Sequence, residues 1–240
     1  MGAILAGALE AAVAISPEQW PQADLTWVNS PANPTGRVHS DQEYLNVIEW
    51  ARANNSVLVS DECYLEFGDD AVPTSILQYT NGNNHNILAV HSLSKRSSMA
   101  GYRGAFLIGD KELIARIREV RKHAGMMVPL PIQKAMTVAL SDETHVAEQR
   151  ARYNSRRAKL APALKAAGFH IEYSNAGLYI WCTRKESDWD SVAWLANLGI
   201  LATPGNFYGE LGKLHIRIAM TATDLQIAEA AARINAAIQG

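Results

Sequence analysis

Short apolar runs alternate with longer amphipathic segments through the first half of the chain. Runs rich in strand-forming residues occur at 25–28, 57–59, 87–90 and 105–108. Between the first two runs, apolar positions repeat at helical spacing from Tyr44 to Ala51, after Ser40 or Asp41 as a cap and before the Asn54-Asn55 break. Strands that alternate with helices predict an α/β fold with a mainly parallel sheet covered by helices.

The second half has a different pattern. It predicts helices over 111–123, 132–140, 143–167, 191–197 and 224–237, and strands over 171–173, 178–182, 200–202 and 215–219. This mixture is typical of a smaller α+β domain. We therefore predict two domains, 1–125 and 126–240, with the boundary near Gly125.

The apolar N-terminal stretch is not typical of a signal peptide. No Lys or Arg precedes Arg37, and Glu10 interrupts an apolar run that is too short to span a bilayer. We expect the end of a helix there, followed by a strand over 11–15.

Composition excludes several functional classes. The chain has 240 residues and a formal net charge of −2, so it shows no basic surface for nucleic acid and no signature of a membrane partner. Its two cysteines and seven histidines lack the spacing of a metal site. Two isolated cysteines suit a reducing compartment, which favours a cytoplasmic location.

Polar side chains follow the ends of several predicted strands. These residues are Asn33, Asp61, Tyr64, Ser92, Ser94 and Lys95. Ligands of parallel α/β sheets bind outside the carboxyl ends of the strands. Three separate segments are therefore expected to place polar groups at one rim of the sheet.

The stretch 91–109 carries the most specific chemistry. Lys95 stands in a serine-rich turn, and Arg103 follows between glycines. A lysine amine can form a Schiff base with a carbonyl, while hydroxyls and a guanidinium can bind an anion. Taken alone, the same letters also fit a strand followed by a polar loop with a solvated lysine.

Two other patterns in the sequence suggest different chemistry. Ser92-Leu93-Ser94-Lys95 matches the SxxK motif of penicillin-binding proteins, but no SDN or KTG motif accompanies it. Cys63 and His91 could form a thiol–imidazole pair, although we favour packing roles for both.

Five motifs occur in order: SPANPTG (30–36), SDECY (60–64), SLSK (92–95), GYRG (101–104) and HIRIA (215–219). Together they resemble the class I/II aminotransferases, which have the fold type I architecture and use pyridoxal phosphate. The stretches 121–133, 177–183 and 199–209 are most similar to succinyldiaminopimelate aminotransferases of lysine biosynthesis. The resemblance implies a mainly parallel large domain and a smaller α+β C-terminal domain.

The resemblance also implies roles around the cofactor ring. Lys95 would form the Schiff base and then move a proton from the substrate α-carbon. Asp61 would keep the pyridine nitrogen protonated, and Asn33 and Tyr64 would hydrogen-bond the ring hydroxylate. A loop-capping aspartate and an Asx turn before proline are the alternatives for Asp61 and Asn33. A cis Asn33–Pro34 bond is implied as well.

Anion-binding roles follow for four more side chains. Ser92, Ser94 and Arg103 would hold the cofactor phosphate. Arg217 would bind the substrate α-carboxylate as a bidentate fork, the alternative being a surface arginine on a strand. Strand alternation places Arg217 on the face opposite Ile216 and Ile218.

Family members carry a Gly/Ser phosphate loop, a ring-stacking aromatic and further strands before the point where this chain begins. The large domain is therefore expected to be N-terminally truncated, with an exposed sheet edge and an apolar face. The implied reaction exchanges an amino group between glutamate and a keto acid, N-succinyl-2-amino-6-oxopimelate, in a full-length homodimer. The alternatives are another amino-acid aminotransferase, a fold type I lyase, or an inactive fragment that only binds or dimerises.

Overall fold

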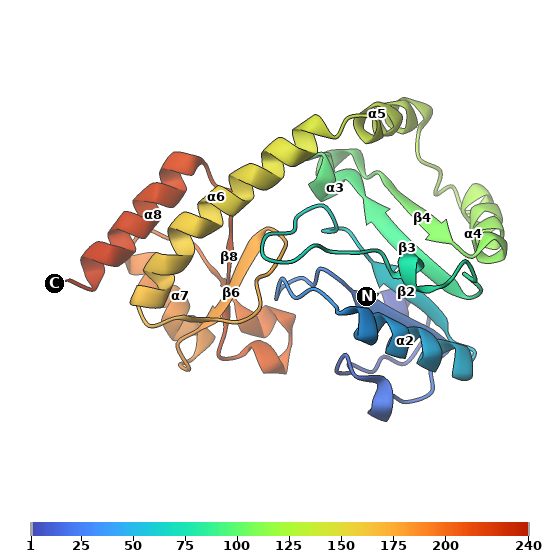
Figure 1. The fold of residues 1–240 in the computed structure, drawn as a ribbon, viewed down its shortest axis with the longest axis horizontal. Helices are drawn as coiled ribbons and strands as arrows, with labels where there is room; N and C mark the ends of the chain where they lie inside the picture. Colours follow the sequence, from blue (N-terminus) through green and yellow to red (C-terminus); the bar gives the residue numbers. More distant parts are fainter. Residues whose placement is uncertain (1, 240) are drawn as a thin grey trace.

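The computed structural model describes residues 2–239, which build two sheets joined in the chain by a long helix (Figure 1). The first sheet has the order β1-β2-β3-β4, from β1 (Leu25–Asn29), β2 (Val57–Asp61), β3 (Ile87–Ser92) and β4 (Ala105–Gly109). The first three strands are parallel, as predicted, whereas β4 runs antiparallel to β3. The chain turns back between them through α3 (Leu93–Arg96) and a short 3₁₀ turn.

Helix α2 (Asp41–Ala53) covers one face of this sheet. Its start is fixed by a capping box, in which Ser40 and Glu43 each satisfy the other's backbone N–H. The core between helix and sheet holds Val28, Tyr44, Val47, Ile48, Ala51, Leu58, Ile76, Ile87 and Ala89. The predicted helical spacing in this segment is therefore the spacing of its buried side chains.

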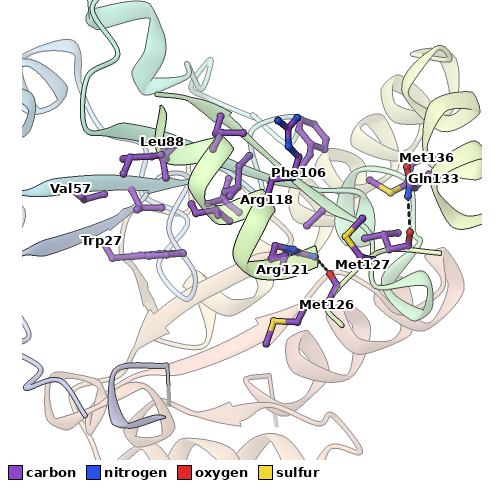
Figure 2. Close-up of a pocket in the computed structure, with 18 of the residues that line it drawn as sticks. Trp27, Val57, Leu88, Phe106, Arg118, Arg121, Met126, Met127, Gln133 and Met136 are labelled. Atoms are coloured by element: carbon purple, nitrogen blue, oxygen red, sulfur yellow. Dashed lines mark hydrogen bonds between the residues drawn. The ribbon is translucent and has the colours of Figure 1, made fainter. Parts of the chain in front are cut away.

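The other face of the sheet is an open apolar groove of about 840 Å³ (Figure 2). Strand residues such as Trp27 and Leu88 form one wall, and α4 (Lys111–His123) and α5 (Leu130–Leu140) contribute to the other side. Trp27 is 57% exposed although it lies on a strand of the sheet. β1 also ends the strand order, so an edge and an apolar face are both open, as the sequence predicts.

Helix α6 (Thr144–Ala166) leads to the second sheet (Figure 1). That sheet is antiparallel, with the order β5-β6-β8-β7, from β5 (His170–Ile171), β6 (Tyr179–Thr183), β7 (Thr203–Pro204) and β8 (Ile216–Ala219). Helices α7 (Asp188–Asn197) and α8 (Asp224–Ala237) complete this half, and α8 lies along α6. The domain boundary near Gly125 falls between α4 and α5 and stays a prediction.

Three predicted strands differ from the structure. Residues 11–14 form no strand and are exposed, and only α1 (Gly2–Leu5) is regular in that region. The strand predicted at 200–202 is wrong, because Ile200 is buried directly after α7 and the pairing with β8 starts at Thr203. The strand predicted at 171–173 stops early, because Tyr173 has a left-handed φ of 54°. Within residues 2–239, no helix is both long and apolar enough to cross a membrane.

Burial of His39 makes the stability of the first half depend on pH. The ring lies edge-on to Tyr44, and burial lowers the pKa of His39 from 6.5 to about 4, although the charge of Glu43 acts in the opposite direction. Below pH 6.5 His39 is protonated in the unfolded chain, whereas in the folded chain it stays neutral down to about pH 4. Stability is therefore full above the unfolded pKa and falls as the pH drops through this window, by up to about 3 kcal/mol.

Urea unfolding at pH 7 and at pH 4.5 tests this expectation. His39→Leu should show a smaller loss of unfolding free energy between the two values than the wild type does. The exposed His123 provides the matched control, since His123→Gln should keep the wild-type difference. An unchanged pH dependence in His39→Leu would contradict the prediction.

Candidate active site

The carboxyl ends of β1, β2 and β3 meet at one rim of the first sheet. Asp61 is in register with Asn29 on one side and with Val90 on the other. The Asn29 side chain donates to the Asp61 carbonyl at 2.9 Å and accepts from the Asn33 N–H at 2.8 Å. The loop that carries Asn33 is thereby tied to the strand end that carries Asp61, which brings the predicted segments together.

Cys63 lies next to Asp61, and the charges around it affect the pKa of its thiol. The Cys63 N–H donates to Asp61 Oδ1 at 3.1 Å. Burial raises the pKa of the Cys63 thiol to about 12, with a further increase from the Asp61 carboxylate, whereas the charge of Lys95 acts in the opposite direction. The Asp61 carboxylate therefore contacts the backbone of the segment that leads to Tyr64.

The raised pKa also argues against a thiol–imidazole site. Cys63 stays protonated at neutral pH, so it is a poor nucleophile. His91 points its Nε2 at the buried carboxylate of Glu62, 3.0 Å away, and stacks on Phe106. This geometry gives both residues the packing roles that we favoured from the sequence.

Ser92 and Ser94 lie side by side at the start of α3. The Ser92 hydroxyl accepts from the Ser94 N–H at 3.1 Å and donates to the Ser94 hydroxyl at 2.8 Å. Ser92 Oγ is also 3.3 Å from the Gly104 carbonyl, next to Arg103. Arg103 is exposed, has a left-handed φ of 55°, and donates to the Ala100 carbonyl at 2.7 Å. The two serine hydroxyls therefore meet at the turn that carries Lys95, whereas the Arg103 guanidinium contacts the Ala100 carbonyl.

Arg217 connects the second sheet to this rim. It lies on β8, where its neighbours Ile216 and Ile218 are buried, as the predicted alternation requires. Arg217 Nη1 donates to Asn33 Oδ1 at 2.9 Å. Its guanidinium carbon lies 3.9 Å from the centroid of the Tyr179 ring. Arg217 is therefore directed toward the first sheet rather than away from the protein.

Tyr64 and Tyr179 form the second link between the two sheets. Their hydroxyls are 3.3 Å apart, and their rings lie edge to face. Burial, followed by the contact with Tyr179, raises the pKa of Tyr64, so its phenol is protonated at neutral pH. In the structure Tyr64 contacts Tyr179, and Asn33 contacts Arg217, so the two predicted ring-hydroxylate ligands each have a partner on the second sheet.

Sequence reasoning missed two aromatic residues of this site, Tyr179 and Tyr208. The Tyr208 ring centroid lies 5.0 Å from the Arg217 guanidinium carbon, on the same cation as Tyr179. Tyr179 has the same strand parity as Trp181, which is in register with Arg217. The alternation of side chains along β6 could have placed Tyr179 on the same face as Arg217, but only if the pairing of β6 with β8 were already known.

The donor set fits pyridoxal phosphate. The paired ends of β2 and β3 carry a carboxylate and two hydroxyls to one rim, and Tyr64 and Arg217 join this rim to the second sheet. Arg217 Nε is buried and has no hydrogen-bond partner within residues 2–239, so it is available to an anionic ligand. The Asn33–Pro34 bond is cis, as the resemblance implied, and Ser30–Pro31 is cis as well.

The open apolar groove is a different feature from this rim. None of the eight predicted site residues lines it. Among the described residues, no cluster of three or more His, Cys, Asp or Glu side chains could hold a metal ion. The predicted site residues therefore lie outside this groove.

Comparisons with known proteins agree with this geometry. The chain is 54% identical over 212 residues to a protein named as a probable aminotransferase of Mycobacterium tuberculosis, covering 88% of this chain and 51% of the relative. It is 53% identical to the 4-dedimethylamino-4-oxo-anhydrotetracycline transaminase of Streptomyces rimosus, covering 88% of this chain and 59% of the relative. The chain thus spans between half and three fifths of the length of these two relatives.

A solved structure shares the fold. The probable N-succinyldiaminopimelate aminotransferase of Thermus thermophilus superposes with a TM-score of 0.80 at 28% identity, over 90% of this chain and 59% of the other. The model of the family "Aminotransferase class I and II" matches residues 3–234. The chain therefore belongs to the class I and II aminotransferases, a family that depends on pyridoxal phosphate.

Proposed function

We propose that the protein is a pyridoxal-phosphate-dependent aminotransferase that exchanges an amino group between glutamate and a keto acid. The observation that supports the proposal is that the strand ends carrying Asp61 and leading into Lys95 lie side by side, with Arg217 in contact with the adjoining Asn33 loop. Asp61 is paired with Val90 on the strand that leads into Lys95, and Arg217 Nη1 donates to Asn33 Oδ1 at 2.9 Å.

The side chains divide the work of such a reaction. The amine of Lys95 would hold the cofactor covalently through its aldehyde and, once released, would take the proton from the substrate α-carbon. The carboxylate of Asp61 would hold a proton on the ring nitrogen. Pyridoxal phosphate, when bound, accepts the electron pair that remains when that α-proton leaves.

The remaining groups bind and orient. Ser92, Ser94 and Arg103 would hold the phosphate through charge-assisted hydrogen bonds, each worth roughly 1.5–3 kcal/mol where a charged group takes part. Arg217 would bind the substrate carboxylate with its planar fork, and the Tyr179 ring against its face would keep that fork in one orientation. Tyr64, protonated at neutral pH, would donate to the ring oxygen.

For the keto acid, we propose N-succinyl-2-amino-6-oxopimelate, which would place the protein in lysine biosynthesis. Support comes from the sequence resemblance and from the Thermus thermophilus neighbour, whose name states that activity. The second candidate is another aminotransferase, since the Streptomyces rimosus relative is named for a tetracycline intermediate at 53% identity. A cytoplasmic location and a homodimeric full-length form complete the proposal, and the free thiols of Cys63 and Cys182 suit that location.

A keto-acid comparison distinguishes these candidates. After glutamate has supplied the amino group, the protein is offered the N-succinyl keto acid or its N-acetyl analogue, which lacks the terminal carboxylate. We expect faster amino transfer to the succinylated compound. Equal rates would contradict recognition of the succinyl group while leaving the aminotransferase proposal intact.

Lys95 should be the lysine that reacts with pyridoxal phosphate. We expect an absorbance band in the near-visible, a stable adduct after borohydride reduction, and the label on Lys95 by peptide mass mapping. Lys95→Arg should lose the band, whereas Lys111→Arg, which changes an exposed lysine, should keep it. Labelling of other lysines as readily as Lys95 would show that the assignment is wrong.

Asp61→Asn should separate cofactor attachment from proton chemistry. The amide keeps the shape of the carboxylate but cannot hold a proton on the ring nitrogen, so Lys95 should still be labelled. The stoichiometric half-reaction with glutamate should slow by roughly 100-fold or more, the loss typical of one preorganised electrostatic group. Asp70→Asn, at an exposed position nearby, should react like the wild type. A wild-type rate in Asp61→Asn would exclude the proposed role.

A further inference from the structure

Lys95 is carried by a helix of a single turn, α3 (Leu93–Arg96). Such a short helix has no stability of its own, so its orientation must come from tertiary contacts. Leu93 and Arg96 lie three positions apart and therefore share one face, and both are buried, with Arg96 only 8% exposed. Lys95 projects about 100° away from Arg96 around the helix axis. The buried face of α3 thus determines where the lysine amine points.

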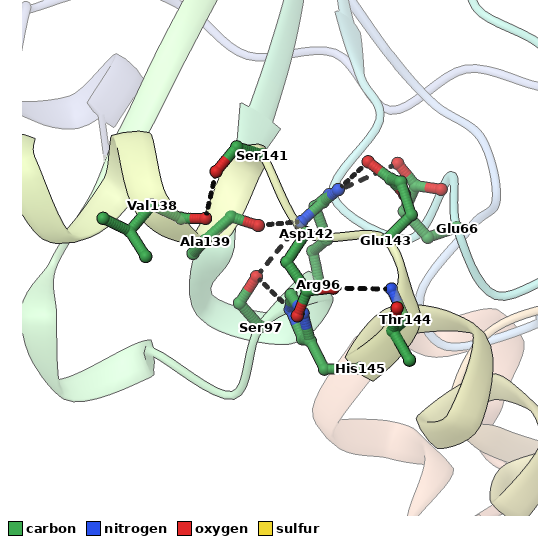
Figure 3. Close-up of polar contacts among 10 residues, drawn as sticks. All are labelled: Glu66, Arg96, Ser97, Val138, Ala139, Ser141, Asp142, Glu143, Thr144 and His145. Atoms are coloured by element: carbon green, nitrogen blue, oxygen red, sulfur yellow. Dashed lines mark hydrogen bonds and ion pairs between the residues drawn. The ribbon is translucent and has the colours of Figure 1, made fainter.

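Arg96 contacts three other elements at once (Figure 3). Its Nη1 donates to the Ala139 carbonyl at 2.9 Å, near the C-terminal end of α5. Its Nη2 donates to the carboxylate of Glu143, the residue that precedes α6. Its Nε lies 3.6 Å from Glu66 Oε1, two residues beyond Tyr64.

Ser97 extends the same joint. Its hydroxyl accepts from Arg96 Nη1 at 3.3 Å and lies 3.0 Å from His145 Nε2. His145 Nδ1 is 2.7 Å from Asp142, which also accepts from the Thr144 N–H at the start of α6. The end of α3 is therefore fastened to the α5–α6 connection by two adjacent side chains.

The contacts of Arg96 restrict the rotation of α3 more strongly than the packing of Leu93 does. An apolar side chain is held by packing, which is non-directional, so Leu93 limits how far α3 can move but only weakly limits its rotation. A planar guanidinium with fixed donor directions limits rotation as well. A nearly buried guanidinium also cannot shift without leaving its charge unpaired, which is strongly unfavourable.

We propose that Arg96 is a positioning residue, which sets the rotation of α3 and so holds the Lys95 amine toward the loop that carries Asp61 and Tyr64. The inference rests on the proposed function, because it concerns the orientation of the lysine that would bind the cofactor. Glu66 makes the connection direct, since it belongs to that loop and pairs with the same guanidinium. Arg96 itself touches neither cofactor nor substrate in this proposal.

The test measures the selectivity of labelling. Wild type and Arg96→Met are treated with pyridoxal phosphate and borohydride, and the label on Lys95 is divided by the label on the exposed Lys111. We expect Arg96→Met to lower this ratio by roughly tenfold to a hundredfold, the scale on which a misplaced reacting group loses rate. Arg96→Lys, which keeps the charge but not the fork, should fall between the two proteins.

Arg156→Met is the matched control. Arg156 also pairs with a carboxylate, that of Asp224, and donates to a backbone carbonyl, that of Met220, at 2.9 Å. Its side chain is 12% exposed, against 9% for Arg96, but it lies between α6 and α8. Its loss should lower stability without changing the labelling ratio. A wild-type ratio in Arg96→Met, or an equal decrease in both methionine variants, would overturn the proposal.

Hydrogen–deuterium exchange gives a readout that needs no cofactor. The amides of residues 93–99 should exchange faster in Arg96→Met than in the wild type and should be unchanged in Arg156→Met. If the wild type shows no preference for Lys95, the proposed function fails, and the exchange rates then decide the role of Arg96 alone. Unchanged exchange over 93–99 in Arg96→Met would overturn the positioning role in either case.

Discussion

The candidate site depends on the parallel register between β2 and β3. Asp61 is paired with Val90, so the strand end that carries Asp61 lies beside the one that leads into Ser92 and Lys95. A slip of one residue would turn Asp61 to the opposite face, because side chains alternate with a period of two. The register itself is held by Leu58 and Ile87, which are paired and buried against α2. Apolar packing on one face therefore sets the position of the charged groups at the rim.

The second constraint is the contact between the two sheets. The Arg217 side chain extends from β8 to Asn33 on the first-sheet side. The rings of Tyr179 and Tyr208 lie against its guanidinium. Aromatic faces stabilise a cation by roughly 0.5–2 kcal/mol without using its hydrogen-bond donors. The planar donor edge of Arg217 consequently remains available for a carboxylate. This arrangement suits the carboxylate-binding role that we propose for Arg217.

Local signals in the sequence predicted much of the fold. The helices over 111–123 and 224–237 have the predicted bounds, because Asp110 and Thr223 cap them and their apolar spacing is regular. The antiparallel direction of β4, the aromatic partners of Arg217 and the contacts of Arg96 were not predictable in this way. These features depend mostly on residues that lie far apart in the chain, such as Arg96 and Ala139 or Arg217 and Tyr179, and no local propensity encodes such pairs. The same limit produced the misplaced strand at 200–202, since β7 exists only through its pairing with β8.

The rim and the apolar groove are stabilised by different interactions. The contacts that assemble the rim, from Asn29 to Arg217, all lie within residues 2–239. The groove instead leaves apolar strand side chains such as Trp27 in contact with water, at roughly 25 cal/mol for each Å² that burial would remove. Covering this face would stabilise the sheet by apolar burial, whereas the rim is held by hydrogen bonds and by the contact of a cation with aromatic rings. Lys95 labelling therefore reports on the rim, while urea unfolding reports on the packing of the sheet as a whole.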